Sequence, residues 1–194
     1  MKRVLAVVLL GVLLLAPAAR AQSGPVGGGN DLQLWTGGGH GTNGSAADTG
    51  VWNIGARYGW VLTDPAGPGP LRGRFEFAVD VVPMFLVFQK TGPTYGFGLN
   101  PFALKWNFVA HHNVSPYLDI GGGTLFTHSQ APPGTSRVNF TTSGAIGVHF
   151  LQSKYNWSAE LRFMHISNAG LSEPNPGINT IQVRIGFGRF TQPE

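Results

Sequence analysis

The feature that most constrains the fold of this chain is a repeated alternation of apolar and polar side chains with a period of two residues. Between residues 51 and 62, large apolar side chains occupy the even positions, while Asn53, Arg57 and two glycines occupy odd ones. Successive side chains of a β-strand point to opposite faces, so each such segment is predicted to be a strand with one apolar and one polar face. A helical period of 3.6 residues is almost absent. The sequence therefore predicts an all-β protein.

Eight segments show this alternation, and joints rich in glycine, proline and asparagine separate them. We expect strands near Asp31–Gly39, Val51–Leu62, Arg72–Val87, Tyr95–Val109, Pro116–His128, Val138–Leu151, Tyr155–Ser167 and Ile178–Phe190. The fourth segment changes phase near Pro101, which predicts a β-bulge there. An even number of antiparallel strands can close into a barrel, because closure pairs both edges of the sheet.

The polar faces decide between two kinds of barrel. In the third segment, Arg74, Glu76 and Asp80 share one face, opposite a row of aromatic and branched side chains. A narrow transmembrane lumen can pair such charges, and glycines on the same predicted face, such as Gly121 and Gly147, suit a narrow lumen. We therefore predict an eight-stranded antiparallel transmembrane β-barrel of the bacterial outer membrane. A soluble lipocalin-like barrel, with its two faces inverted, is the alternative, and a row of charges is hard to place in its apolar cavity.

The N-terminus predicts export. Two basic residues and an apolar run over residues 4–16 precede the small-residue motif Ala19-Arg20-Ala21. This order is typical of a secretory signal peptide, and the run is shorter than the about 20 residues that a membrane-spanning helix needs. We therefore expect residues 1–21 to be a cleaved signal peptide and residues 22–194 to form the barrel.

Charge and cysteine content exclude several classes of function. Three of the thirteen basic residues lie in the predicted signal peptide, which leaves ten against nine acidic residues. The mature chain is thus close to neutral and has no basic block, which argues against a nucleic-acid partner. Cysteine is absent, which excludes disulfides and thiolate chemistry.

A histidine and a serine lie where the predicted barrel faces lipid. His165 and Ser167 are two residues apart at the far end of the seventh segment, so their side chains leave the same face. Phe163 belongs to that face too, which marks it as the lipid-facing one. Asn179, on the eighth segment, shares the same face and height. Polar groups that face lipid are costly unless they are paired or have a function.

These three residues match the chemistry of a serine hydrolase. A serine hydroxyl becomes a good nucleophile when an imidazole accepts its proton, and the imidazole needs a partner that fixes its tautomer. Ser167, His165 and Asn179 can fill the roles of nucleophile, base and orienting residue. The spacing alone does not decide between this hypothesis and polar interfacial residues at a strand end.

The segment Met164-His165-Ile166-Ser167-Asn168-Ala169-Gly170, with Asn175-Pro176-Gly177, resembles the signature of the lipid A 3-O-deacylase (PagL) and acyloxyacyl hydrolase family. The resemblance implies an eight-stranded outer-membrane esterase that removes the 3-O-linked acyl chain of lipid A. It implies Ser167 as the nucleophile and His165 as the general base. Lipid A, or the lipopolysaccharide that contains it, would be the substrate.

The same resemblance implies how the reaction is supported. An oxyanion site is implied near Asn168 and the backbone amides of Ala169 and Gly170, with Asn175 as a further positioning residue. No cofactor and no metal are implied. The sequence leaves a homodimer open.

The chain departs from the family pattern at Asn179, where the acidic member of the triad is expected. An asparagine carbonyl can accept the imidazole N–H, but it cannot stabilise the imidazolium with a full charge. We therefore expect a slower enzyme, or one in which another acid such as Glu173 substitutes. The alternative function is a non-catalytic structural or adhesive barrel whose external loops do the work.

The other histidines are interpreted as structural. His111 and His112 are adjacent at a predicted turn, which does not favour metal binding because neighbouring side chains of a strand diverge. His128 and Ser129 diverge for the same reason. His149 falls on the inner face and is expected to be a hydrogen-bonded residue of the lumen.

Overall fold

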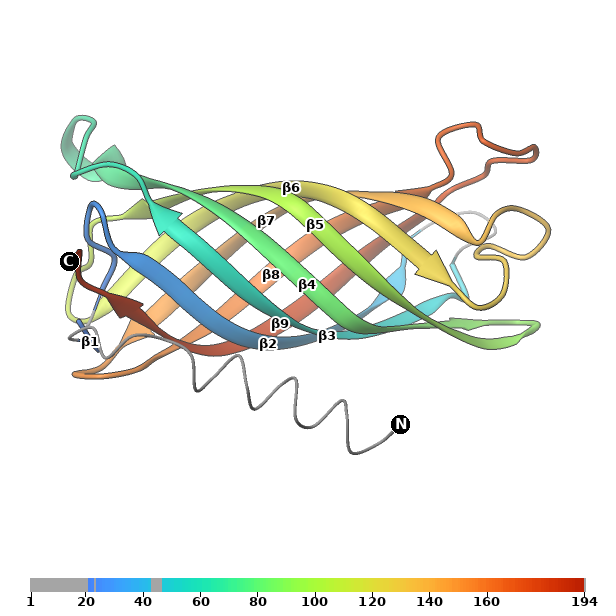
Figure 1. The fold of residues 1–194 in the computed structure, drawn as a ribbon, viewed down its shortest axis with the longest axis horizontal. Helices are drawn as coiled ribbons and strands as arrows, with labels where there is room; N and C mark the ends of the chain where they lie inside the picture. Colours follow the sequence, from blue (N-terminus) through green and yellow to red (C-terminus); the bar gives the residue numbers. More distant parts are fainter. Residues whose placement is uncertain (1–20, 23, 43–46, 194) are drawn as a thin grey trace.

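The structure, a computed structural model, describes residues 21–22, 24–42 and 47–193. Within these residues, eight long antiparallel strands close into a barrel, as predicted (Figure 1). They are β2 (Asn30–Gly41), β3 (Gly50–Val61), β4 (Gly73–Gln89), β5 (Gly92–Phe108), β6 (Val114–Thr127), β7 (Val138–Leu151), β8 (Asn156–Ser167) and β9 (Ile178–Thr191). Closure is made by β9, which pairs with both β8 and β2.

Short elements complete the fold. The two-residue strand β1 (Ala21–Gln22) pairs with the end of β9, and the 3-10 turn η2 (Gly69–Leu71) precedes β4. No helix in the described part of the chain is long and apolar enough to cross a membrane. The predicted signal peptide lies outside the described residues except for Ala21, so it stays a prediction.

Four of the connections between strands gather at one end of the barrel. They join β2 to β3, β4 to β5, β6 to β7 and β8 to β9, and the last two are seen at the right of Figure 1. We call this end the outward end. The C-terminus lies at the other end, together with the remaining connections.

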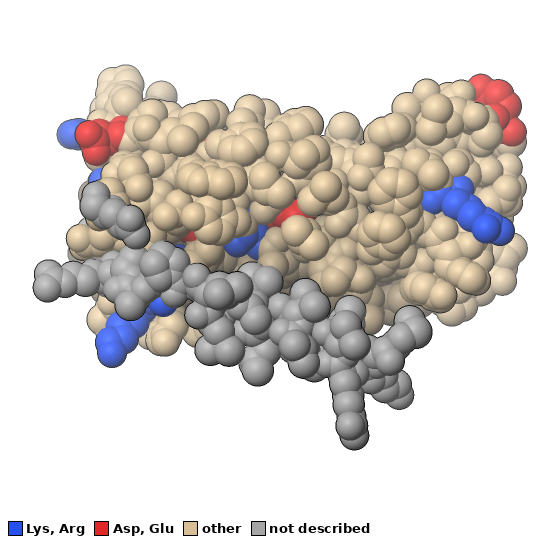
Figure 2. All heavy atoms as spheres, viewed as in Figure 1, with Lys and Arg blue, Asp and Glu red and all other residues tan. Residues whose placement is uncertain are grey.

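The outer surface between the two ends is apolar. Side chains such as Phe97, Ile146 and Val183 are 57–59% exposed, and they follow the predicted alternation. On the face shown in Figure 2, charged atoms gather mainly at the two ends. Apolar exposure on this scale is costly in water and favourable in lipid. The fold is therefore a transmembrane barrel rather than the soluble alternative with inverted faces.

The lumen holds a network of buried charges. Arg57 donates to Asp80 at 2.7 Å and to Asp119 at 2.6 Å, and Asp119 also accepts from Arg162 at 3.0 Å. In the neighbouring layer, Lys105 donates to Asp31 at 2.7 Å. Glu76 and Asp80, which were predicted to face inward from β4, are therefore buried and paired with oppositely charged side chains of other strands, whereas Arg74, near the start of β4, is half-buried and forms no ion pair with a described residue.

Glycines make room for the larger lumen side chains, as predicted. A Cβ atom at Gly147 would lie 2.3 Å from Cζ of Tyr117, and one at Gly55 would lie 2.3 Å from the indole ring of Trp35. Neither ring could keep its place over a larger residue. The narrow lumen is thus filled by side chains and is not an open channel.

Two bulges modify the ladder. The register between β5 and β6 shifts between Leu99 and Phe102, which confirms the bulge predicted near Pro101. A second shift, between Val82 and Phe85 of β4, was not predicted. It surrounds Pro83, which has no N–H to donate to a ladder and is tolerated at such an irregularity.

Candidate active site

The polar groups predicted to face lipid are placed by the last two strands of the barrel. His165 lies near the outward end of β8, opposite Thr142 of β7 and Asn179 of β9. Ser167 is the last residue of β8 and shares the outer face, whereas the neighbouring Met164 and Ile166 are buried in the lumen. The row of Thr142, His165 and Asn179 therefore crosses three strands at one height.

A short hydrogen bond joins the predicted base to its predicted orienting residue. Nδ1 of His165 lies 2.6 Å from Oδ1 of Asn179. An amide oxygen can only accept, so Nδ1 carries the hydrogen of this bond. In the neutral ring, the other nitrogen, Nε2, then keeps a lone pair that can accept a proton. Asn179 thus selects the tautomer that a general base needs.

Ser167 lies beside this pair but is not bonded to it. Within the described part of the chain, no hydrogen bond joins Ser167 to His165. Backbone positions two residues apart are about 6.6 Å from each other along a strand. Side-chain rotations on the shared face can bring the hydroxyl towards Nε2, and catalytic hydrogen bonds often shorten only when a substrate binds.

Gly177 lies against the ring of His165. It has a left-handed backbone conformation, with φ of +66°, and a Cβ atom there would lie 2.7 Å from Cε1 of His165. Any larger residue would push the ring away. Sequence reasoning quoted Gly177 only as part of the family signature and assigned it no role, although the Pro176-Gly177 pair signals a turn.

Thr42 fixes the backbone of Asn179 from the other side. The backbone N–H of Thr42, which follows β2, donates to the carbonyl oxygen of Asn179 at 2.9 Å, and the Thr42 hydroxyl lies 3.4 Å from the same oxygen. Sequence reasoning missed this residue. No local pattern signals it, because the contact exists only where the first and last long strands meet.

The loop of residues 168–177 engages some of the predicted oxyanion donors in its own hydrogen bonds. The side chain of Asn168 is buried, and its Nδ2 donates to the carbonyl oxygen of Ser172 at 2.9 Å. The N–H of Gly170 donates to Oδ1 of Asn168 at 2.8 Å. The N–H of Asn168 donates to Oδ1 of Asn175 at 3.2 Å. Asn168 therefore organises the loop.

Two of the predicted donors of this loop remain for a ligand. The N–H of Ala169 and Nδ2 of Asn175 donate to no acceptor among the residues that the structure describes. Ala169 has φ of +53°, an uncommon conformation for a residue with a side chain and one that is found at functional turns. The alternative acid Glu173 is exposed in the same loop, where the structure shows no hydrogen bond or ion pair between it and His165.

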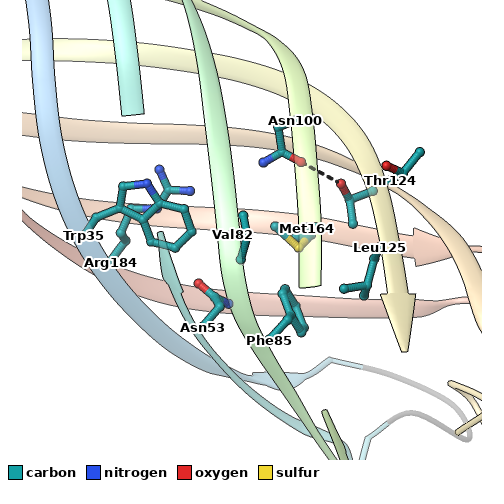
Figure 3. A pocket seen from close by; sticks show the side chains of 11 residues that line it. Trp35, Asn53, Val82, Phe85, Asn100, Thr124, Leu125, Met164 and Arg184 are labelled. Carbon is teal, nitrogen blue, oxygen red and sulfur yellow. Dashed lines mark hydrogen bonds between the residues drawn. The ribbon is translucent and has the colours of Figure 1, made fainter. Parts of the chain in front are cut away.

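The side of the barrel wall behind the site is closed. Met164 points into an apolar cluster of the lumen with Trp35, Val82 and Phe85, around a cavity of about 10 Å³ (Figure 3). The guanidinium of Arg184 lies 3.8 Å from the centre of the Trp35 ring and covers it. A cavity of this size holds at most one water molecule. Access to His165 and Ser167 is therefore from the lipid-facing surface.

His149 and His112 have the structural settings that were predicted. Nδ1 of the buried His149 lies 3.3 Å from Oδ1 of Asn156, and Nε2 lies 3.5 Å from Nζ of Lys105. His112 lies in a turn, with φ of +47°. Across the described ranges, no group of three or more His, Cys, Asp or Glu side chains has an arrangement that could hold a metal ion.

Known proteins resemble this chain in sequence and in fold. The family model described as lipid A 3-O-deacylase (PagL) matches residues 52–188. The lipid A deacylase PagL of Bordetella bronchiseptica (strain ATCC BAA-588 / NCTC 13252 / RB50) is 33% identical over 72 residues, which span 37% of this chain and 40% of that relative. The chain therefore matches less than half the length of this relative.

Two solved structures share the architecture. The crystal structure of the outer membrane enzyme PagL aligns with a TM-score of 0.62 and 18% identity, over 79% of this chain and 97% of that one. The outer membrane protein OprG from Pseudomonas aeruginosa aligns with a TM-score of 0.51 and 10% identity, over 88% and 99% of the two chains. At these identities, the likeness is one of fold.

Proposed function

This chain belongs to the lipid A 3-O-deacylase (PagL) family, and we propose that it is an outer-membrane esterase that removes the 3-O-linked acyl chain of lipid A. The observation that carries the proposal is the 2.6 Å contact between His165 and Asn179, beside Ser167, on a surface that faces lipid. The fold does not need a polar pair at this place. We also propose that a cleaved signal peptide, residues 1–21, exports the chain.

The proposed reaction begins with Ser167. Nε2 of His165 accepts the hydroxyl proton while Oγ attacks the ester carbonyl carbon, and Nδ1–H stays bonded to Oδ1 of Asn179. The carbonyl oxygen becomes an oxyanion, which accepts hydrogen bonds from the N–H of Ala169 and from Nδ2 of Asn175. Both donors belong to the loop that begins directly after Ser167.

Two further steps complete the reaction, the collapse of the tetrahedral intermediate and the hydrolysis of the acyl-enzyme. His165 returns its proton to the sugar oxygen, the ester bond breaks, and an acyl group remains on Oγ of Ser167. A water molecule gives a proton to Nε2 and attacks the acyl carbon, which releases the fatty acid and restores the serine hydroxyl. Each proton that His165 accepts is returned within the same half of the cycle.

The position of the site suits a lipid whose ester bond lies near the membrane surface. Phe163, directly before His165 on the outer face, is 48% exposed and belongs to the apolar band. Beyond Ser167 the chain enters the polar loop of residues 168–177. An ester bond with its acyl chain in the apolar band and its sugar at the loop would place its carbonyl group at the height of Ser167.

The experiment that tests this proposal is mass spectrometry of lipid A from cells that lack another deacylase and express the wild-type chain, Ser167→Ala or Thr36→Ala. Thr36 offers a matched hydroxyl, because it lies exposed on the lipid-facing side of β2, away from the site. We expect the wild type and Thr36→Ala to remove one hydroxyacyl group, and Ser167→Ala to remove none.

Folding is checked separately by heat-modifiable electrophoretic migration. Loss of the hydroxyacyl group in cells that express Ser167→Ala would contradict the assignment of the nucleophile. Intact lipid A in all strains, with folded barrels, would contradict the proposed activity and favour the non-catalytic structural or adhesive barrel.

A further inference from the structure

The lipid-facing surface carries a second feature, a slot between two aromatic pairs of β5 and β6. Tyr95 stacks on His128, with ring centres 5.0 Å apart and planes 9° apart. Phe97 stacks on Phe126, with ring centres 5.2 Å apart and planes 23° apart. Between the pairs lies a hollow of about 330 Å³, which we call the β5–β6 slot. Its lining residues are Pro83, Tyr95, Gly96, Phe97, Phe126, Thr127 and His128.

The unpredicted bulge of β4 contributes one side of the slot. Pro83 lies inside the register shift between Val82 and Phe85, and a bulge bends its strand locally. Tyr95 and Phe97 are each 58% exposed, so the aromatic walls stand out from the barrel. Two stacked walls with a space between them form a site for an elongated apolar group.

The slot lies at the same end of the barrel as the candidate active site. Strands β6 and β8 run in the same direction, because each is antiparallel to β7 between them, and they end at Thr127 and Ser167. The slot and Ser167 therefore lie at the same end of the barrel, on strands that β7 separates. The slot itself belongs to different strands from the candidate site.

Polar groups border the slot at its outward side. The hydroxyl of Tyr95 lies 3.4 Å from Nδ1 of His128. The carbonyl oxygen of Arg137 accepts from the N–H of the slot residue Thr127 at 2.9 Å. No acidic side chain lines the slot. Apolar walls below a hydrogen-bonding border suit an acyl chain attached to a polar head group.

We propose that the β5–β6 slot binds one acyl chain of a lipid A molecule. The choice of lipid A over another lipid rests on the proposed function, whereas the existence of an acyl site rests on the slot alone. The chain lies between the two aromatic pairs, and the phosphorylated sugar lies at the polar border. The acyl chain in this slot would belong to the substrate itself or to a neighbouring lipid A molecule, and it would lie apart from the ester bond that reacts.

Photo-crosslinking of the full-length barrel in bilayers tests the proposal. Two probes carry the same diazirine-bearing acyl chain, one as lipid A and one as phosphatidylethanolamine, and the labelled peptides are mapped by mass spectrometry. We expect the lipid A probe to label the peptides of residues 95–97 and 126–128 about tenfold more than the Tyr155/Phe187 stack, the ratio that a preference of about 1.4 kcal/mol gives. That stack, with ring centres 5.3 Å apart, also lies on the outer face, and its two residues do not line the slot.

Three variants serve as controls for the labelling experiment. Tyr95→Ala with Phe97→Ala should reduce labelling of the slot to the level of the control stack, whereas Tyr155→Ala should leave it unchanged. Equal labelling by both probes would overturn the assignment to lipid A, and uniform labelling around the barrel would overturn the slot. The Ser167→Ala barrel is labelled in parallel. Labelling that persists there, in a chain without deacylase activity, would support the slot even if the proposed function fails.

Discussion

Polar side chains occupy two contrasting regions of this barrel, the lumen and the outward end of the lipid-facing surface. In the lumen, Arg57, Asp119 and Arg162 are buried and hold one another in ion pairs. On the outer face, His165 and Asn179 form a single hydrogen bond beside Ser167. Paired charges in the lumen are what closure of a narrow barrel requires. Barrel closure does not require the polar residues of the outer face, so these residues are candidates for a catalytic role.

Asp119→Ala tests the stabilising role of the lumen network and should have the largest effect on stability. This change removes the carboxylate that accepts from both Arg57 and Arg162, and two buried guanidinium groups lose a partner. Breaking a buried pair in this way should lower the free energy of unfolding by about 3–5 kcal/mol. Urea unfolding in lipid vesicles measures this loss.

Ser167→Ala is the matched change on the outer face. It should leave the free energy of unfolding within about 0.5 kcal/mol of the wild type, as surface substitutions usually do. A similar loss of stability in Asp119→Ala and Ser167→Ala would show that the two regions do not differ in the way described.

Gly177→Ala tests whether the position of the His165 ring on the outer face determines the rate of deacylation. The new Cβ atom would displace the His165 ring, and a shift of about 1 Å in a catalytic group can cost about 100-fold in rate. Deacylation of lipid A in mixed micelles measures the effect. Gly134→Ala is the control, because Gly134 has a similar φ of +80° with open space around its Cβ position.

Both glycine changes carry the strain of a left-handed alanine, which costs about 1 kcal/mol of stability. If Gly134→Ala reduced the rate as strongly as Gly177→Ala, backbone strain would explain the loss and the contact with His165 would not.

Asn179→Glu tests what the missing charge means. A carboxylate at this place would accept from Nδ1 of His165 and stabilise the imidazolium that forms during the reaction. Charge-assisted hydrogen bonds are roughly twice as strong as neutral ones, so we expect kcat to rise about tenfold. Asn179→Leu removes the acceptor and should lower kcat. A fall in kcat with Asn179→Glu would show that the site is built around a neutral partner.

The smallest effect is expected for the ion pair of Asp48 and Lys90, which is exposed at the outward end at 2.6 Å. The hydrogen bond and the charge of Lys90 lower the pKa of the Asp48 carboxyl below its usual range. Any stability from this pair is present above the pKa that Asp48 has in the unfolded chain, and it is lost as the pH falls through the lowered pKa. Water screens the pair on all sides.

Lys90→Met should therefore return the pKa of Asp48 towards its ordinary value and leave unfolding and activity unchanged. Carboxyl NMR titration in micelles measures the pKa. A clear loss of stability at neutral pH in Lys90→Met would mean that charge pairs outside the lumen support the barrel as well.

The sequence predicted the barrel because side-chain alternation in strands is a local property. Charges at Glu76 and Asp80 pointed inward as expected, and the phase change near Pro101 marked a real bulge. The bulge at Pro83 was missed because Val82, Pro83 and Met84 are all apolar, so a shift of phase there leaves no trace in the alternation.

Part of the candidate site was predictable for the same reason. Strand phase and height placed His165 and Asn179 together, and the structure joins them. Thr42 was not predictable, because its contact depends on which strands meet at closure. The engagement of Asn168 with Ser172 depends on the path of an irregular loop, which alternation does not describe.

The contact between Thr42 and Asn179 has a consequence for when the protein can act. Asn179 lies at the seam of the barrel, with β8 on one side and the continuation of β2 on the other. The two sides of this seam come from opposite ends of the chain and meet only when the last strand joins the first. A chain in transit, or one whose seam is open, lacks the clamp on the residue that orients His165. Completion of the site is thereby tied to completion of the barrel, so the proposed activity would begin only after the barrel has closed in the membrane.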